Sequence, residues 1–250
     1  MSGSQTTHNF MLNFKKLTPD QITLRRRILE ISHKKHLSHL GSCLSSVDII
    51  STIYNIKKKS EPFILSNGHA GVALYAVLEK NKFINEKQIS QLNIHPDRNL
   101  EQNIYVSTGS LGQGLPIALG MAFSNRKKNV YCMISDGEAT EGSIWEALRV
   151  GSEYNLLNLK IVLNANGWGA YSSINLSKLN KRVEAFGWNT KIVDGHDMKT
   201  LAKALKLKMK KPLLIFAHTQ VNQLPFLKGQ DAHYYVMTDE DYEKSLKLLK

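Results

Sequence analysis

Two polar clusters contain the residue types that bind a metal ion, and each follows an apolar run typical of a buried strand. Ser135-Asp136-Gly137-Glu138 comes directly after the run 130–134, and Asn164-Ala165-Asn166-Gly167 comes directly after the run 160–163. Asn166 lies 30 positions after Asp136, which is the length of one βαβ unit. Neighbouring parallel strands end at the same edge of a sheet, so we expect Asp136 and Asn166 to be close in space.

One carboxylate and one amide oxygen suit Mg²⁺, because this ion keeps few protein ligands and takes the others from water and phosphate oxygens. Gly137 leaves space for a phosphate to approach the main chain, and a following helix N-terminus adds amide donors. A Ser-Asp-Gly turn on its own is more often only a turn, so the prediction depends on the second cluster as well. Together the two clusters predict a diphosphate held with Mg²⁺.

These clusters need a sheet to position them, and the chain alternates apolar runs with helix-like stretches. Strands are expected over 63–65, 130–134, 160–163, 189–193 and 213–217. Helices are expected from Pro19, where Thr18 and Gln21 form a capping box, from near Ser45, and over 69–78, 142–154, 177–186, 198–207 and 239–249. This alternation predicts an α/β fold with a parallel sheet and helices on both faces. Without a linker or an internal repeat, we expect one domain over 1–250, with 1–16 as an N-terminal extension.

Composition argues against several other classes of protein. The 250 residues carry 33 Lys and Arg and 21 Asp and Glu, a net charge of +12, but this charge is scattered and accompanies no zinc-ligand spacing or RNP-type segment. We therefore expect no nucleic-acid partner. Two cysteines, short apolar stretches and an N-terminus without a leader pattern predict a cytoplasmic protein that does not bind membranes. A phosphohydrolase or nucleotide-binding protein would need a nucleophilic Asp or a P-loop, and neither pattern is found.

Five motifs carry a resemblance to a known family. SDGEATEGSIWEALRVGSEYNLLNLKIVLNANG resembles the signature of thiamine-diphosphate enzymes, which begins with Gly-Asp-Gly and ends in paired Asn one βαβ unit later. SHLGSCLSSVDI, ILSNGHAGVALYAVL, STGSLGQGLPIALGMA and VDGHD resemble successive transketolase motifs and stand in the transketolase order. The resemblance runs from about residue 17 to about residue 235 and implies the transketolase fold that binds the diphosphate of thiamine diphosphate.

The resemblance also implies roles for individual residues. Mg²⁺, for which Ca²⁺ or Mn²⁺ can substitute, would be bound by Asp136, Asn166 and the main-chain carbonyl of Trp168. Thiamine diphosphate would be contacted by His69, Gly109, Leu111, Gly137, Glu138, Glu141 and Asn166. The catalytic histidines would be His39, His69, His95 and His233, since ketol transfer needs proton movement on sugar hydroxyls and imidazole titrates near neutral pH.

Some positions allow a second interpretation. Ser135 stands where the family has its first Gly, and the first Asn of the pair is Asn164 or Ala165, depending on the alignment. These departures leave open a non-catalytic paralogue that acts as a scaffold. Glu141 either belongs to a carboxylate network at a dimer interface or is a helix N-terminal glutamate favoured by the helix dipole. Deoxyxylulose-phosphate synthases and two-oxoacid dehydrogenase subunits share the diphosphate signature, but SNGH and EGSIWEA favour transketolase.

In the family, the glutamate that contacts the aminopyrimidine ring lies in a separate pyrimidine-binding domain. These 250 residues show no motif of that domain, so we expect the N-terminal subunit of a two-component transketolase. It would be active only with a partner subunit that carries the pyrimidine domain, in an assembly expected to be a heterotetramer. The reaction implied is transfer of a two-carbon ketol unit between sugars or sugar phosphates.

Overall fold

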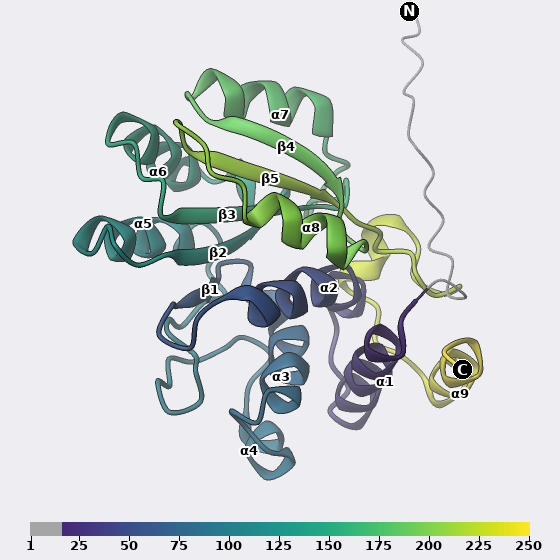
Figure 1. The fold of residues 1–250 in the computed structure, drawn as a ribbon. Helices are drawn as coiled ribbons and strands as arrows, with labels where there is room; N and C mark the ends of the chain where they lie inside the picture. The colour runs from purple at the N-terminus through teal and green to yellow at the C-terminus, as the bar shows by residue number, and fades with distance from the viewer. Residues whose placement is uncertain (1–16) are drawn as a thin grey trace, which may run out of the picture.

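The computed structural model describes residues 17–250, and the extension expected over 1–16 lies outside the described residues. Within them, five parallel strands form one sheet in the order β1-β2-β3-β5-β4 (Figure 1). The strands are β1 (Phe63–Leu65), β2 (Val130–Ser135), β3 (Leu159–Ala165), β4 (Asn189–Asp194) and β5 (Leu213–His218). The predicted parallel sheet is therefore confirmed.

Helices cover both faces of the sheet, as predicted (Figure 1). One layer contains α1 (Pro19–Lys34), α2 (Leu40–Ile56), α3 (Gly71–Lys80) and α8 (Met198–Leu205). The other contains α5 (Gly114–Ser124), α6 (Gly142–Glu153) and α7 (Leu176–Ala185). The remaining helices are α4 (Glu86–Gln91), α9 (Asp239–Leu248), which packs against α1, and the short turns η2 (Gly68–Ala70), η3 (Glu138–Thr140) and η4 (Gly229–His233).

The alternation of side chains along each strand divides the apolar residues into two cores. In β2, Tyr131 and Met133 pack with α1, α2 and α3, whereas Cys132 and Ile134 pack with α5 and α6. All six residues of β2 are buried, which is typical of a parallel strand covered on both faces. The near-continuous apolar run in the sequence thus reflects two helical layers rather than one.

The start of the first helix is as predicted from the sequence, whereas the start of the second helix is not. Thr18 accepts the amide of Gln21 and the side chain of Gln21 accepts the amide of Thr18, so the predicted capping box is confirmed. The second helix begins at Leu40 rather than near Ser45, so that prediction is wrong. The reason is packing, because every residue from Leu40 to Tyr54 is buried, including small polar ones that give little apolar periodicity. The helices α4 and α5 were not predicted from the sequence.

The strand register brings the two polar clusters together. Ser135 pairs with Asn164 across β2 and β3, and Asn164 pairs with Ala217 of β5. The amide of Asp136 then donates to the carbonyl of Asn164 at 3.2 Å. The carboxyl edge of the sheet therefore carries the residues that the sequence singles out. No helix among residues 17–250 is long and apolar enough to cross a membrane.

Candidate functional site

Asp136 follows β2 directly, and its side chain is only 1% exposed. Its Oδ1 accepts the amide of Gly137 at 3.0 Å, and its Oδ2 accepts the amide of Gly167 at 2.6 Å. No Lys, Arg or His within residues 17–250 forms an ion pair with this carboxylate. Burial raises the pKa of the Asp136 carboxyl to about 7. A bound cation would stabilise the ionised form, so this side chain fits a metal ligand.

Asn166 and Trp168 lie at the end of the neighbouring strand, β3. The hydrogen bond from the Gly167 amide to Asp136 joins the two strand ends. The side-chain oxygen of Asn166 accepts the amide of Trp168 at 2.9 Å, which fixes the turn after the strand. The structure therefore brings Asp136, Asn166 and the Trp168 main chain to one place, and their role as metal ligands stays a prediction.

After Asn166 the chain turns back on itself, and we call residues 167–174 the 167–174 hairpin. It is closed by main-chain bonds from Ile174 to Gly167 (2.8 Å) and from Gly169 to Ser172 (2.9 Å). Gly137 faces this hairpin: a Cβ added there would lie 3.1 Å from Gly169 Cα and 3.5 Å from the Trp168 carbonyl oxygen. Gly137 thus keeps side-chain atoms out of the space beside the Trp168 carbonyl.

Asn164, one of the two candidates for the first Asn of the family's pair, has a structural role in the fold. Its amide nitrogen donates to the hydroxyls of Ser45 and Ser46 at 3.0 Å each, and its oxygen accepts the hydroxyl of Thr219. These contacts join β3 to α2 and to the loop after β5. Buried partners therefore take both amide hydrogens of Asn164 and one of the two acceptor positions of its oxygen.

Ser135 stands where the family has glycine, and the structure shows how the larger residue is accommodated. Its hydroxyl accepts the amide of Glu138 at 3.1 Å and so caps the η3 turn. Ser135 is buried and makes this bond with the turn that carries Glu138.

Glu138 joins three of the sequence motifs. Its Oε1 accepts the hydroxyl of Ser66 at 2.6 Å and the amide of Gly112 at 2.8 Å. Its Oε2 is buried and has no hydrogen-bond partner among the described residues. Burial raises the pKa of this carboxyl to about 7, against the lowering effect of these hydrogen bonds. Glu138 therefore holds the SNGHA and GSLGQG loops against the SDGE turn.

Three of the four predicted catalytic histidines form a cluster. The ring centroids of His39 and His69 lie 5.2 Å apart, and the His233 ring lies 6.5 Å from His39 and 6.3 Å from His69. Burial lowers the pKa of His39 to about 4 and that of His69 to about 3, and the neighbouring histidines lower both further. Burial also lowers the pKa of His233. Desolvation therefore favours the neutral form of all three imidazoles in this structure, and their catalytic role stays a prediction.

His95 lies at the edge of this cluster and is exposed. Its ring packs on Gly109, where an added Cβ would approach the His95 Cγ to 2.8 Å, and Gly109 has a φ of +147°. Leu111 is half-buried in the same loop. Glu141 is exposed and its Cβ lies against Gly112, so its carboxylate is free of the contacts that hold Glu138.

Several buried polar atoms at this edge have no hydrogen-bond partner among the described residues. They are His39 Nδ1, His233 Nδ1, both side-chain amide atoms of Asn67, Thr108 Oγ1 and Glu138 Oε2. Such atoms cost about 1–3 kcal/mol each when unpaired, so a polar ligand would stabilise them. Sequence reasoning did not assign roles to Ser66, Asn67 or Thr108, although each lies within a quoted motif.

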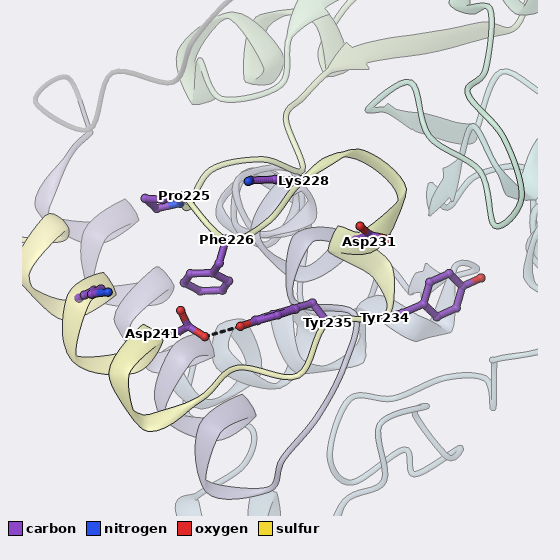
Figure 2. Close-up of a pocket in the computed structure, with 8 residues that line it drawn as sticks. Pro225, Phe226, Lys228, Asp231, Tyr234, Tyr235 and Asp241 are labelled. Carbon is purple, nitrogen blue, oxygen red and sulfur yellow. Dashed lines mark hydrogen bonds between the residues drawn. The ribbon is translucent and has the colours of Figure 1, made fainter.

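A separate cavity of about 650 Å³ lies between α9 and the segment before it (Figure 2). Its lining residues are Pro225, Phe226, Lys228, Asp231, Tyr234, Tyr235, Asp241 and Lys244. Tyr235 donates to Asp241 at 2.6 Å across this cavity. Neither Asp136 nor the clustered histidines His39 and His69 line it, so it is distinct from the carboxyl edge of the sheet.

A parallel sheet with buried polar side chains at its carboxyl edge is typical of α/β proteins that bind a ligand at that edge. Residues 22–244 match the family model described as "Transketolase, thiamine diphosphate binding domain", and the chain belongs to this family. The family predicted from the five motifs is therefore confirmed.

Comparison with curated proteins identifies relatives of two kinds. Transketolase of Pongo abelii is 37% identical over 209 residues, which cover 72% of this chain and 33% of that protein. The chain thus spans about a third of the length of such relatives. A protein of Phocaeicola vulgatus, named as one of the subunits of an apulose-4-phosphate transketolase, is 30% identical over 253 residues, which cover 89% of this chain and 90% of that protein.

Solved structures show the same fold. Transketolase from Campylobacter jejuni superposes with a TM-score of 0.84 at 24% identity, covering 95% of this chain and 43% of that one. A Pichia stipitis transketolase variant, solved with fructose 6-phosphate, has a TM-score of 0.79 at 21% identity, covering 93% of this chain and 40% of that one. The likeness extends over nearly the whole chain.

Proposed function

We propose that this chain is the component of a two-component transketolase that binds Mg²⁺ and the diphosphate of thiamine diphosphate. One observation carries the proposal: Asp136 is a buried carboxylate without a cationic partner among the described residues, beside Asn166 and the Trp168 main chain. A second polypeptide would supply the pyrimidine-binding domain. The similarity over 90% of the length of a protein named as one transketolase subunit supports this division.

The donor set at the sheet edge suits the proposed metal. A carboxylate, an amide oxygen and a main-chain carbonyl are hard oxygen ligands, which Mg²⁺, Ca²⁺ and Mn²⁺ prefer. We assign these roles to Asp136, Asn166 and Trp168. Gly137 leaves room for the diphosphate, and His69, Gly109, Leu111, Glu138 and Glu141 would contact the cofactor or order the loops around it.

When bound, thiamine diphosphate would stabilise the carbanion character that transfer of a two-carbon ketol unit requires. The histidines of this chain would hold the sugar. A neutral imidazole donates at one ring nitrogen and accepts at the other, so His39, His69 and His233 can bind hydroxyl or phosphate oxygens. Nδ1 of His39 and of His233 lack partners among the described residues and are available for these bonds. His95, at the exposed rim, would contact the outer part of the sugar.

Glu141 lies on the exposed side of the GSLGQG loop. We propose that a partner chain covers it in a heterotetramer, so that the cofactor lies between unlike subunits. The substrates would be sugars or sugar phosphates. We also propose a cytoplasmic location, which the two buried free cysteines support.

Calorimetry tests the proposal directly. Thiamine diphosphate is titrated into the chain with MgCl₂ or with EDTA, with and without the candidate partner chain, and ketol transfer is assayed in parallel. We expect binding that requires Mg²⁺ and transfer that requires both chains. Absence of binding with Mg²⁺ and the partner present would favour a scaffold without cofactor. Thiamine-dependent transfer by this chain alone would contradict the two-component arrangement.

A further inference from the structure

The carbonyl oxygen of Ala170 accepts two side-chain hydrogen bonds. Gln230 Nε2 donates to it at 2.6 Å, and the Tyr234 hydroxyl donates at 3.0 Å. Both donors belong to residues 229–235, which we call the His233 segment because His233 lies between them. A carbonyl oxygen has two lone pairs, so these two bonds use its whole accepting capacity.

A second contact joins the same two pieces of chain. The ring of Trp168 lies against Gly229, where an added Cβ would approach the ring to 2.9 Å. Gly229 has a φ of +50°, so both its backbone conformation and this close approach favour glycine. The 167–174 hairpin and the His233 segment therefore touch at Trp168 and at Ala170.

The hairpin is hydrogen-bonded to two of the proposed metal ligands. Its first residue, Gly167, donates to Asp136, and the amide of Trp168 donates to Asn166. Trp168 also pairs with Ser173 across the hairpin. A shift of the Trp168 carbonyl therefore shifts the Ala170 carbonyl, two residues further along the same short hairpin.

The His233 segment is connected in turn to the histidine cluster. The carbonyl of His233 accepts the amide of His39 at 2.9 Å, and the Tyr234 ring lies 6.3 Å from the His39 ring. Figure 2 shows Tyr234 and Tyr235 extending to opposite sides of the segment. Tyr235 bonds to Asp241 of α9, whereas Tyr234 bonds to the hairpin. Removing the Tyr235 hydroxyl therefore breaks a hydrogen bond in the same segment without affecting the bonds to Ala170, so Tyr235→Phe is a matched control for Tyr234→Phe.

We propose that Gln230 and Tyr234 are positioning residues that couple occupancy of the metal–diphosphate site to the placement of His233 and His39. The inference rests on the proposed function, since it takes Asp136, Asn166 and Trp168 as the metal ligands. Cofactor binding fixes the hairpin, and the two bonds to Ala170 transmit this order to the His233 segment. Because coupling between sites is reciprocal, loss of both bonds also weakens cofactor binding, by roughly three- to tenfold.

Hydrogen–deuterium exchange of the full chain tests this coupling. With the candidate partner chain present, exchange is compared with and without thiamine diphosphate and MgCl₂ in wild type, in the double variant Gln230→Ala/Tyr234→Phe, and in the control Tyr235→Phe. In wild type and in the control, we expect the cofactor to slow exchange at residues 136–140, at the hairpin and at the His233 segment. In the double variant, we expect slower exchange at residues 136–140 and at the hairpin, but not at the His233 segment.

Three results overturn the inference, and they differ in what they say about the proposed function. If the double variant keeps the full cofactor-dependent protection of the His233 segment, the coupling does not run through Ala170, and the proposed function stands. If the cofactor protects neither residues 136–140 nor the hairpin in wild type, both proposals fail together. If Gln230 and Tyr234 only stabilise the fold, the double variant should exchange faster at the His233 segment by the same factor with and without the cofactor. That result also contradicts the coupling.

Discussion

The hydroxyl of Ser66 donates a 2.6 Å hydrogen bond to Oε1 of Glu138, although the two residues lie 72 positions apart. Ser66 follows β1 and Glu138 follows β2, so the bond joins two adjacent strand ends. The same oxygen accepts the amide of Gly112, which precedes α5. One buried carboxylate therefore fixes the relative positions of the loop that carries His69, the GSLGQG loop and the turn that carries Asp136.

Glu138→Gln is expected to remove a pH dependence of stability. Burial raises the folded-state pKa of Glu138 to about 7, above its ordinary value of 4.5. The folded chain then binds this proton more tightly than the unfolded chain, so the contribution is present below pH 4.5 and is lost as pH rises through 7. Relative to wild type, the variant should gain about 3 kcal/mol of unfolding free energy between pH 4 and pH 8.

Urea unfolding at several pH values measures this difference. Glu146→Gln is the control, because Glu146 is exposed on α6 and pairs with Arg149 at the surface. Parallel pH profiles for wild type and Glu138→Gln would show that the Glu138 carboxyl titrates normally.

Asp136→Asn is expected to abolish the Mg²⁺ dependence of cofactor binding. The substitution keeps the shape of the side chain and removes the charge that the metal would neutralise. Loss of a metal-ligand contact typically exceeds the effect of losing an outer-shell partner, so affinity should fall by roughly tenfold or more. Calorimetry with thiamine diphosphate and MgCl₂ measures it. Asp194→Asn, at the end of β4, makes the same change at another strand end and should leave the affinity intact.

His69→Gln is expected to make the chain more resistant to acid. Burial lowers the folded-state pKa of His69 from 6.5 to about 3, so the folded chain resists protonation at this ring. Above pH 6.5, the His69 ring is neutral in both states and does not change the stability of wild type. As the pH falls from 6.5 toward 3, the ring is protonated only in the unfolded chain, so wild type becomes less stable. Between those limits, wild type should lose about 1.4 kcal/mol per pH unit relative to the variant.

Thermal or urea unfolding between pH 7 and pH 4.5 measures the effect. The unfolding free energy should fall more steeply with decreasing pH in wild type than in His69→Gln. His36→Asn, at an exposed position, should follow the wild-type slope. The prediction is refuted if His69→Gln loses stability with acid as steeply as wild type does.

Asn164→Ala is expected to destabilise the fold by about 2–4 kcal/mol, because it removes partners from three buried hydroxyls. Those hydroxyls belong to Ser45, Ser46 and Thr219. Urea unfolding measures the loss, with Asn222→Ala as an exposed control. A stability equal to that of the control, together with lost cofactor binding, would instead make Asn164 a ligand.

The order of the elements could be predicted from local patterns. Apolar runs such as 130–134 and 213–217 mark strands because a parallel strand buries both of its faces. The Thr18 capping box marks the first helix because its two hydrogen bonds lie within one turn. The start of α2 could not be found in this way, because its first turn is buried by contacts with distant residues such as Ala232 and Val221 at Gly41.

The sequence by itself determined the family, the parallel sheet and the meeting of Asp136 with the Asn166 turn, since strands of one βαβ unit end at the same edge. Only the tertiary structure decided that Asn164 braces α2, that Glu138 joins three loops, and that burial lowers the pKa of His39 and His69. These properties depend on burial and on partners far apart in the chain. Spacing along a sequence reports which residues share an edge, whereas desolvation is set by everything packed around them.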